Sequence, residues 1–138
     1  MSPDIDDWRV IDENKISAVI DLDGGLDIGV PCVPNHLLYI YYPIRDGRLP
    51  DRKKLSALGE FGAKLIGSGH RVLSHCGLGL NRSALVAGSI LVAMGFEGKE
   101  AVQLIRSKRP GALFNPVFAQ YLESLSGPAR DPRPTRKR

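Results

Sequence analysis

HCGLGLNRS, residues 75–83, is the stretch of this sequence that decides the fold. Residues 71–74 (RVLS) predict a short strand before it, and the apolar residues 83–94 predict a helix that Gly95 closes. Two glycines, Gly77 and Gly79, let the connecting loop turn tightly, so that successive backbone N–H groups point toward a common centre. The positive end of the helix dipole adds to their field. The stretch therefore predicts a concave anion-binding site between strand and helix.

Cys76 and Arg82 give this predicted site its chemistry. Arg82 stands six positions after Cys76, on the first turn of the helix, where its guanidinium can fold back and hold two oxygens of a tetrahedral dianion. A free cysteine has a pKa of about 8.5, and a helix N-terminus with neighbouring cations lowers it to about 3.5–7.5. The spacing predicts a thiolate at the base of a phosphate-shaped cradle, placed to attack phosphorus in line with the departing oxygen.

The rest of the chain predicts short alternating strands and helices around this loop. Strands are expected at residues 15–22, 37–44 and 71–74, and helices at 83–94, at 99–108 and after the capping residues Asp51 and Asn115. This order indicates an α/β fold, a single compact domain with a largely parallel central sheet flanked by helices. Such folds bind ligands at the carboxyl ends of the strands, which is where Cys76 falls.

The charge of the chain is concentrated at its C-terminal end. The 138 residues carry a net charge of +4, and residues 128–138 alone hold five basic groups and one acidic group, so residues 1–127 are neutral. Within these, residues 1–40 carry eight acids and two bases, and residues 41–127 carry twelve bases and six acids. We expect residues 1–127 to form the catalytic domain and the basic, proline-rich residues 128–138 to be a disordered tail. The basic pI therefore does not by itself indicate a nucleic-acid-binding protein.

Several protein classes are excluded by composition. Hydrophobic residues make up 43% of the chain and charged residues 25%, as in ordinary globular domains. The two cysteines, Cys32 and Cys76, cannot build a disulfide scaffold, and the acidic start of the chain lacks the apolar core of an export signal. The apolar residues 84–96 are too few to span a membrane. We expect a cytoplasmic monomer without cofactor or metal, since no His, Cys or carboxylate cluster shows metal-ligand spacing.

At this point three segments match a known pattern. His75-Cys76-x5-Arg82-Ser83, with Gly79 inside it, resembles the signature loop of the cysteine-based protein tyrosine phosphatase superfamily. The upstream segment YPIRD, residues 42–46, and the downstream segment KRPGALFNPVF, residues 108–118, are most similar to its dual-specificity branch. The resemblance covers about residues 15–126. It implies a fold of the dual-specificity phosphatase type and a metal-independent phosphatase that works through a cysteinyl-phosphate intermediate.

The resemblance also implies a role for each matching residue. Cys76 is the nucleophile, Asp46 is the general acid and then the general base, and Ser83 donates a hydrogen bond to the sulfur of Cys76. His75 supports the loop by hydrogen bonding, and Asn115 is a further supporting residue. The phosphoryl oxygens are expected to be bound by the loop positions Gly77, Leu78, Gly79, Leu80, Asn81 and Arg82.

Each of these roles competes with a simpler structural interpretation. Asp46 lies in an Arg-Asp-Gly sequence, where an aspartate is also a common turn residue, and Asp51 on the same loop is better explained as a helix cap. Ser83 and Asn115 are acceptable helix N-caps without any catalytic role. Cys32 is expected to be structural, and a regulatory disulfide with Cys76 is the alternative.

The substrate stays open at the level of sequence. Phosphorylated protein is the expected partner, with phosphoserine and phosphothreonine accepted beside phosphotyrosine, because the chain lacks a segment that would build a deep pocket. The loop has no lysine, which argues against phosphoinositides, and Leu78 stands where dual-specificity phosphatases often have alanine. The run Gly79-Leu80-Asn81-Arg82 also resembles RNA 5′-triphosphatases of the same superfamily. Nucleic acid enters only as that alternative substrate or through the tail, and a non-catalytic phosphate-binding module is the other alternative.

Overall fold

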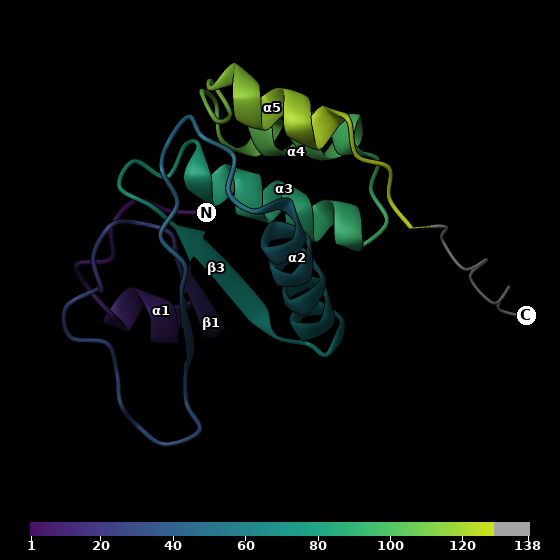
Figure 1. The fold of residues 1–138 in the computed structure, drawn as a ribbon. Coiled ribbons are helices and arrows are strands. Elements are labelled where there is room, and N and C mark those ends of the chain that lie inside the picture. Colours follow the sequence, from purple (N-terminus) through teal and green to yellow (C-terminus); the bar gives the residue numbers. More distant parts are fainter. Residues whose placement is uncertain (129–138) are drawn as a thin grey trace, which may run out of the picture.

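The structure is a computed structural model that describes residues 1–128, and the tail expected to be disordered lies, from residue 129 on, outside the described residues. The chain folds into a small sheet with helices packed around it (Figure 1). Its elements, in chain order, are α1 (Arg9–Glu13), β1 (Ile16–Asp21), β2 (Leu38–Tyr41), α2 (Arg52–Gly67), β3 (Arg71–His75), α3 (Arg82–Ala93), α4 (Gly98–Lys108) and α5 (Pro116–Glu123).

The three strands form a parallel sheet in the order β2-β1-β3. β1 is central, and the last four residues of its sequence ISAVID are all buried, as in a strand that is covered on both faces. Its residue Ile20 aligns with Ile40 on one side and with Ser74 on the other. The carboxyl ends of all three strands therefore meet at one edge of the sheet, and the prediction of an α/β domain with a parallel sheet is confirmed.

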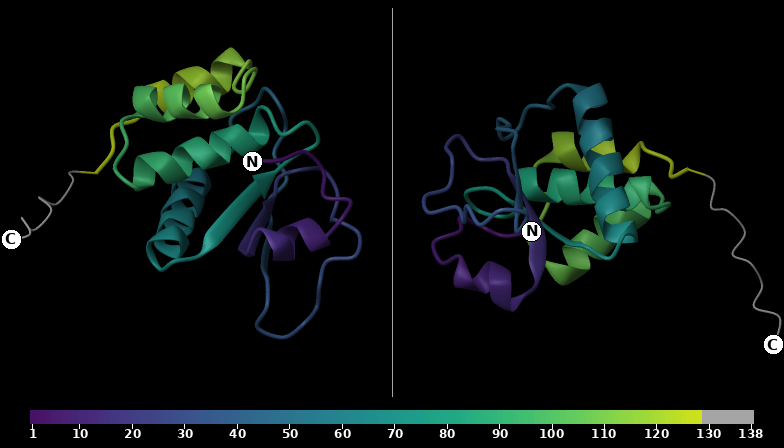
Figure 2. Two further views of the ribbon diagram at one scale, coloured as in Figure 1. Left: turned by 180° about the vertical axis from the view of Figure 1, so that it is seen from behind. Right: turned by 90° about the horizontal axis from the view of Figure 1, so that it is seen from below.

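The helices pack in two layers over one face of the sheet. Figure 1 shows α2 and α3 against the strands and α4 and α5 outside α3, while α1 lies on the other side of β3; Figure 2 shows the same layers from behind and from below. The core between these layers is built on fully buried side chains such as Leu85, Phe118 and Leu122. Each such side chain stabilises the fold by about 1.5–3 kcal/mol through burial alone.

Most observed element bounds lie within one residue of the expected ones, and the largest differences are the end of the second strand and an additional helix near the N-terminus. The second strand ends at Tyr41 rather than at residue 44 because Pro43 has no N–H for the ladder, although Tyr42 N still donates to Asp21 O and Ile44 N to Leu22 O. Helix α3 begins at Arg82, one residue before the expected start, with Asn81 at the N-cap position. The short helix α1 was not expected, because its acidic sequence RVIDE buries only Ile11.

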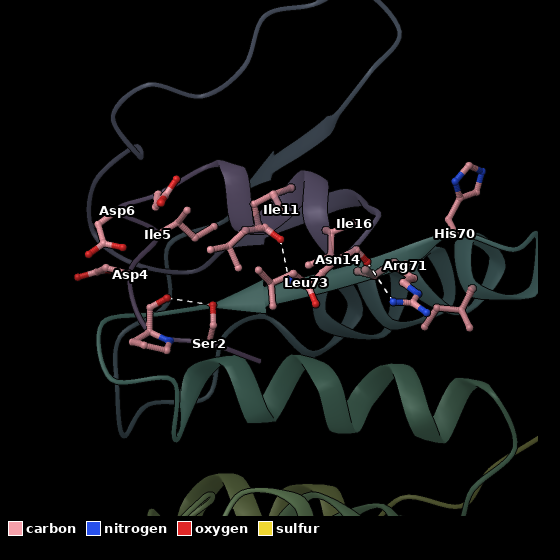
Figure 3. Close-up of a pocket in the computed structure, with 15 residues that line it drawn as sticks. Ser2, Asp4, Ile5, Asp6, Ile11, Asn14, Ile16, His70, Arg71 and Leu73 are labelled. Carbon is pink, nitrogen blue, oxygen red and sulfur yellow. Dashed lines mark hydrogen bonds between the residues drawn. The ribbon is translucent and has the colours of Figure 1, made fainter.

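β3 is an edge strand, and the N-terminal residues lie against part of its free edge. Ser2 N donates to Ser74 O at 2.9 Å, and Cys76 N donates to Ser2 O at 3.2 Å. Beside this contact lies a groove of about 670 Å³ (Figure 3). Its walls come from the N-terminal segment, α1, the end of α2 and β3, and they include Ile5, Val10, Ile11, Ile66, Val72 and Leu73. Within residues 1–128, no helix has the length and apolar character needed to cross a membrane.

Candidate active site

Cys76 lies at the carboxyl end of β3, at the start of the loop formed by residues 76–81, which we call the Cys76 loop. Its side chain is 2% exposed. The backbone N–H of Gly79 donates to Cys76 Sγ at 3.3 Å, and Ser83 Oγ lies 3.5 Å from the same sulfur. Ser83 is buried in the first turn of α3, and the N-cap position of this helix belongs to Asn81. The sulfur thus lies beside two hydrogen-bonding groups at the N-terminus of α3.

These surroundings shift the acidity of Cys76. Burial raises the pKa of the thiol, because a charged sulfur loses its hydration. The bonds from Ser83 and Gly79 and the positive charge of Arg82 favour the thiolate and outweigh burial, so that the pKa of Cys76 lies below its ordinary value. The thiolate is the nucleophilic form of cysteine. Cys32, in contrast, is exposed, and both cysteines are free thiols.

Arg82 is anchored at one side of its guanidinium. Nη1 donates to Asp23 Oδ1 at 3.0 Å and, more weakly, to Leu22 O at 3.5 Å and to Ile44 O at 3.4 Å. Nη2 lies beside Gly77, 3.5 Å from the position that a β-carbon there would take. The anchor through Nη1 holds the guanidinium at the Cys76 loop. The edge that carries Nη2 is the part of the group that could bind the oxygens of an anion.

Gly79 allows the Cys76 loop to pack against the start of the chain. Its φ angle is 67°, which glycine adopts without strain. A β-carbon at this position would stand 2.5 Å from Ser2 C and 2.6 Å from Pro3 N, closer than atoms approach. The N-terminal segment, whose Ser2 bonds to Ser74 O and Cys76 N on either side of His75, therefore requires glycine here.

Asn81 connects Asp46 and Asn115 to the Cys76 loop. Its side chain is 3% exposed; Nδ2 donates to Asp46 Oδ2 at 3.3 Å, and Oδ1 accepts a hydrogen bond from Asn115 N at 3.2 Å. The side chain of Asn115 caps α5 by accepting from Val117 N at 2.9 Å, whereas its contact with Asn81 uses the backbone N–H. Asp51 caps α2 by accepting from Lys54 N. The predicted general acid is therefore tied to the loop that carries the nucleophile.

Two leucines complete the Cys76 loop. Leu78 is 66% exposed, and its carbonyl oxygen accepts from Arg109 Nη2 at 3.2 Å. The carbonyl oxygen of Leu80 accepts from Leu113 N at 2.8 Å. Both carbonyl oxygens are thus held by partners outside the Cys76 loop, and the N–H groups of the loop stay the candidate anion-binding groups.

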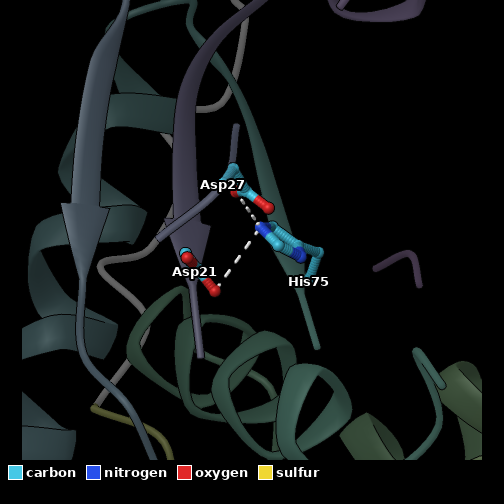
Figure 4. Close-up of side chains that lie close together, drawn as sticks. All are labelled: Asp21, Asp27 and His75. Atoms are coloured by element: carbon cyan, nitrogen blue, oxygen red, sulfur yellow. Dashed lines mark hydrogen bonds and ion pairs between the residues drawn. The ribbon is translucent and has the colours of Figure 1, made fainter. Parts of the chain in front are cut away.

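His75, the residue before Cys76, lies in a buried polar cluster at the carboxyl ends of the strands (Figure 4). Its Nε2 is 2.6 Å from Asp27 Oδ2 and 3.6 Å from Asp21 Oδ1. The hydroxyl of Tyr39 donates to Asp21 Oδ2 at 2.5 Å, lies 2.9 Å from Asp27 Oδ2, and accepts from Asp27 N at 3.1 Å. Burial and the neighbouring Asp21 raise the pKa of Tyr39, so its hydroxyl remains a donor. We call these four residues the His75 cluster.

Three members of the His75 cluster, Asp21, Asp27 and His75, are residue types that can bind a metal ion. One ligand atom each from Asp21, Asp27 and His75 lie within 4.8 Å of one another. These side chains already take part in hydrogen bonds with one another and with Tyr39, because Tyr39 donates to Asp21 and His75 donates to Asp27. These hydrogen bonds explain why the side chains of the cluster lie so close together.

Sequence reasoning overlooked four residues of this site: Asp21, Asp23, Asp27 and Tyr39. Two of them left a signal, because Asp21 and Asp23 come at the end of a buried strand parallel to the one that carries Cys76. Side chains at the carboxyl ends of neighbouring parallel strands meet at one edge. Asp27 left none, because it reaches His75 from an irregular loop.

Comparison with known proteins places the chain in a family. The dual specificity phosphatase catalytic domain matches residues 3–126. A search of curated proteins finds no match. The structure resembles the crystal structure of DUSP15, with 24% identity, coverage of 86% of this chain and 74% of that one, and a TM-score of 0.69.

It also resembles Tk-PTP in the active form, with 26% identity, coverage of 87% and 88%, and a TM-score of 0.65. A third similar structure is kinase associated phosphatase carrying a serine in place of its catalytic site cysteine, with 22% identity, coverage of 84% and 71%, and a TM-score of 0.70. With a family match over nearly the whole described region and a cysteine-centred anion loop, the chain belongs to the dual-specificity phosphatase catalytic domain family.

Proposed function

We propose that this protein hydrolyses phosphomonoesters through a cysteinyl-phosphate intermediate formed on Cys76. The observation that carries the proposal is the environment of Cys76 Sγ. The N–H of Gly79 donates to this sulfur at 3.3 Å, and the hydroxyl of Ser83 lies 3.5 Å from it. A thiolate with a lowered pKa, set among N–H donors beside Arg82, is the arrangement that an attack on phosphorus requires.

In the first step the thiolate of Cys76 attacks phosphorus, the S–P bond forms and the bond to the leaving oxygen breaks. Asp46, protonated, gives its proton to that oxygen, so that an alcohol or phenol departs. Arg82 and the loop N–H groups bind the three phosphoryl oxygens and stabilise the charge spread over them in the transition state. Because most of the catalysis is positioning and charge stabilisation, these donors have to be in place before substrate arrives.

In the second step water attacks the phosphoryl group and the S–P bond breaks. Asp46, now a carboxylate, takes the proton from the water, and inorganic phosphate leaves. The hydroxyl of Ser83 stabilises the departing thiolate by hydrogen bonding, which makes sulfur a better leaving group. His75 acts on the loop and takes no proton from the substrate.

The proposed substrate is a phosphorylated protein, with phosphotyrosine, phosphoserine and phosphothreonine as candidates. Leu78, exposed beside the cradle, offers an apolar contact to the residue that carries the phosphate. In a reducing compartment such as the cytoplasm, Cys76 would persist as the free thiol found in the structure. RNA 5′-triphosphate is the alternative substrate, and phosphate binding without turnover is the alternative function.

The test is hydrolysis of an aryl phosphate in the presence of EDTA. We expect turnover by the wild type, none by Cys76→Ser, and unchanged turnover by Cys32→Ser, which removes the exposed cysteine instead. Mass spectrometry of acid-quenched enzyme should find a phosphoryl group on Cys76. Equal hydrolysis by wild type and Cys76→Ser would refute the proposal.

Identifying the substrate class takes a panel of a phosphotyrosine peptide, a phosphothreonine peptide, an inositol phosphate and an RNA 5′-triphosphate. The substrate with the highest kcat/KM identifies the substrate class. Binding of the phosphopeptide without hydrolysis of any substrate would instead support the phosphate-binding module.

A further inference from the structure

The carboxylate of Asp27 makes the shortest contact to the imidazole of His75. Asp27 Oδ2 is 2.6 Å from His75 Nε2, and both side chains are nearly or fully buried. Nε2 faces carboxylates on both sides, so this nitrogen carries the hydrogen. Nδ1, on the other side of the ring, is buried and has no hydrogen-bond partner among residues 1–128. The orientation of the ring therefore depends on Nε2 alone, and chiefly on Asp27.

His75 leads directly into the Cys76 loop. Its carbonyl oxygen accepts from Leu22 N at 3.0 Å, and the next N–H, that of Cys76, donates to Ser2 O at 3.2 Å. A shift of the imidazole would move this backbone. The groups that reach the sulfur, Gly79 N and Ser83 Oγ, lie 3.3 and 3.5 Å from it, so both contacts depend on where this backbone holds Cys76.

We propose that Asp27 is a positioning residue of the catalytic centre: it holds the imidazole of His75 and, through it, the start of the Cys76 loop. This inference rests on the proposed function of Cys76 as nucleophile and adds a residue that touches neither the sulfur nor the phosphate. Tyr39 assists, because its hydroxyl contacts Asp27 twice, at Oδ2 and at the backbone N–H.

The hydrogen bond and the negative charge of Asp27 act on Cys76 in opposite directions. If the bond is lost, the donors around the sulfur loosen and the thiolate becomes less favourable. If only the charge is lost, a buried negative charge near the sulfur disappears and the thiolate becomes more favourable. The sign of the change therefore separates positioning from plain electrostatics. The other titratable groups facing the imidazole are Asp21 on β1, Tyr39 on β2 and Asp4 in the N-terminal segment.

Two variants of Asp27 separate these effects. Both side-chain bonds of Asp27, to His75 and to Tyr39, use Oδ2, so Asp27→Asn with its amide oxygen at that place keeps both bonds and loses the charge. Asp27→Ala loses the bonds and the charge. The matched control is Asp12→Ala, because Asp12 also pairs with a histidine, His36, at 2.8 Å, but on the exposed surface.

The measurement is the pH profile of Cys76 alkylation by iodoacetamide in a Cys32→Ser background. This reports the thiolate without requiring turnover, so the result stands even if no phosphatase activity is found. We expect Asp27→Ala to move the midpoint upward by about one pH unit, which is about tenfold less thiolate below the midpoint. Asp27→Asn should stay within a few tenths of a unit of the wild type, and Asp12→Ala should match it.

A downward shift in both Asp27 variants, or no shift in Asp27→Ala, would overturn the proposal. Thermal unfolding of each variant shows whether it is folded. If Asp27→Ala does not fold, Tyr39→Phe serves instead, because it removes the hydroxyl that holds Asp27 and keeps the ring. Tyr39→Phe should raise the midpoint in the same direction by a smaller amount, and an unchanged or lowered midpoint would count against positioning.

Discussion

Replacing Asn81 by alanine is the perturbation that tests how Asp46 is held. The buried amide of Asn81 donates to Asp46 Oδ2 at 3.3 Å and accepts from Asn115 N at 3.2 Å, so a single side chain joins the acid, the Cys76 loop and the start of α5. Alanine removes both bonds and leaves Asp46 free to move on its exposed turn.

The size of the effect follows from these two bonds. A hydrogen bond to a charged group contributes about 1.5–3 kcal/mol and a neutral one about 0.5–1.5 kcal/mol. Asp46 is exposed and its bond is long, so water replaces much of it, and we take about 1–2 kcal/mol for both together. A domain of this kind is stable by about 5–15 kcal/mol, so Asn81→Ala should remain folded. A loss of about 1 kcal/mol in the positioning of Asp46 corresponds to about a fivefold lower rate.

The assay compares two aryl phosphates. We expect Asn81→Ala to lower kcat about fivefold for phenyl phosphate, whose leaving oxygen needs a proton, and to leave kcat for 2,4-dinitrophenyl phosphate nearly unchanged. Asn14→Ala is the control, since Asn14 also donates from Nδ2, to Val10 O at 2.8 Å, but at the C-cap of α1 and not in the Cys76 loop. An equal loss with both substrates would show that Asn81 does not act through Asp46.

Three further results are expected. Gly79→Ala should destabilise the protein to urea and abolish activity, because its β-carbon would stand 2.5 Å from Ser2 C, whereas Gly24→Ala, with nothing within 4 Å, should do neither. Ser83→Ala should raise the pKa of Cys76, seen as an upward shift of the alkylation midpoint; an unchanged midpoint would remove Ser83 from thiolate stabilisation. Because folding lowers the pKa of Cys76, the thiolate adds stability that is fully present above the ordinary value of about 8.5 and is lost as the pH falls through the folded value. The difference in unfolding free energy between wild type and Cys76→Ser should therefore grow with pH in that window, and a flat difference would contradict the lowered pKa.

Much of the site could be predicted from the sequence because its central residues are close together along the chain. The strand, the two glycines and the cysteine-to-arginine spacing all lie within a dozen residues, so their geometry follows from one strand–loop–helix unit. Asp46 required the resemblance to a family, since an Asp-Gly pair alone is a common turn. The structure ties Asp46 to the loop through Asn81, which the sequence offered only as a phosphate-binding position.

The parts that were overlooked depend on contacts between distant segments. Asp23 reaches Arg82 across 59 positions, and Asp27 reaches His75 across 48. The sequence signal for Asp23 was only its place at the end of a buried strand, and Asp27 had none, because an aspartate in a glycine-rich loop is equally explained by a turn. The same holds for Ser2, whose backbone meets Cys76 only after the chain has folded.

The acidic character of residues 1–40 acquires a physical meaning from these contacts. Three of their eight acids contact the cationic or hydrogen-donating groups of the site, since Asp23 anchors Arg82 and both Asp21 and Asp27 lie beside His75. Carboxylates this close oppose both a thiolate and an incoming phosphate dianion. The lowered pKa of Cys76 therefore depends on donors at hydrogen-bond distance, above all Ser83 and the Gly79 N–H, and not on the net charge of the protein. For the same reason, salt should weaken thiolate formation only slightly, because hydrogen bonds in a buried site are screened far less than charges on the surface.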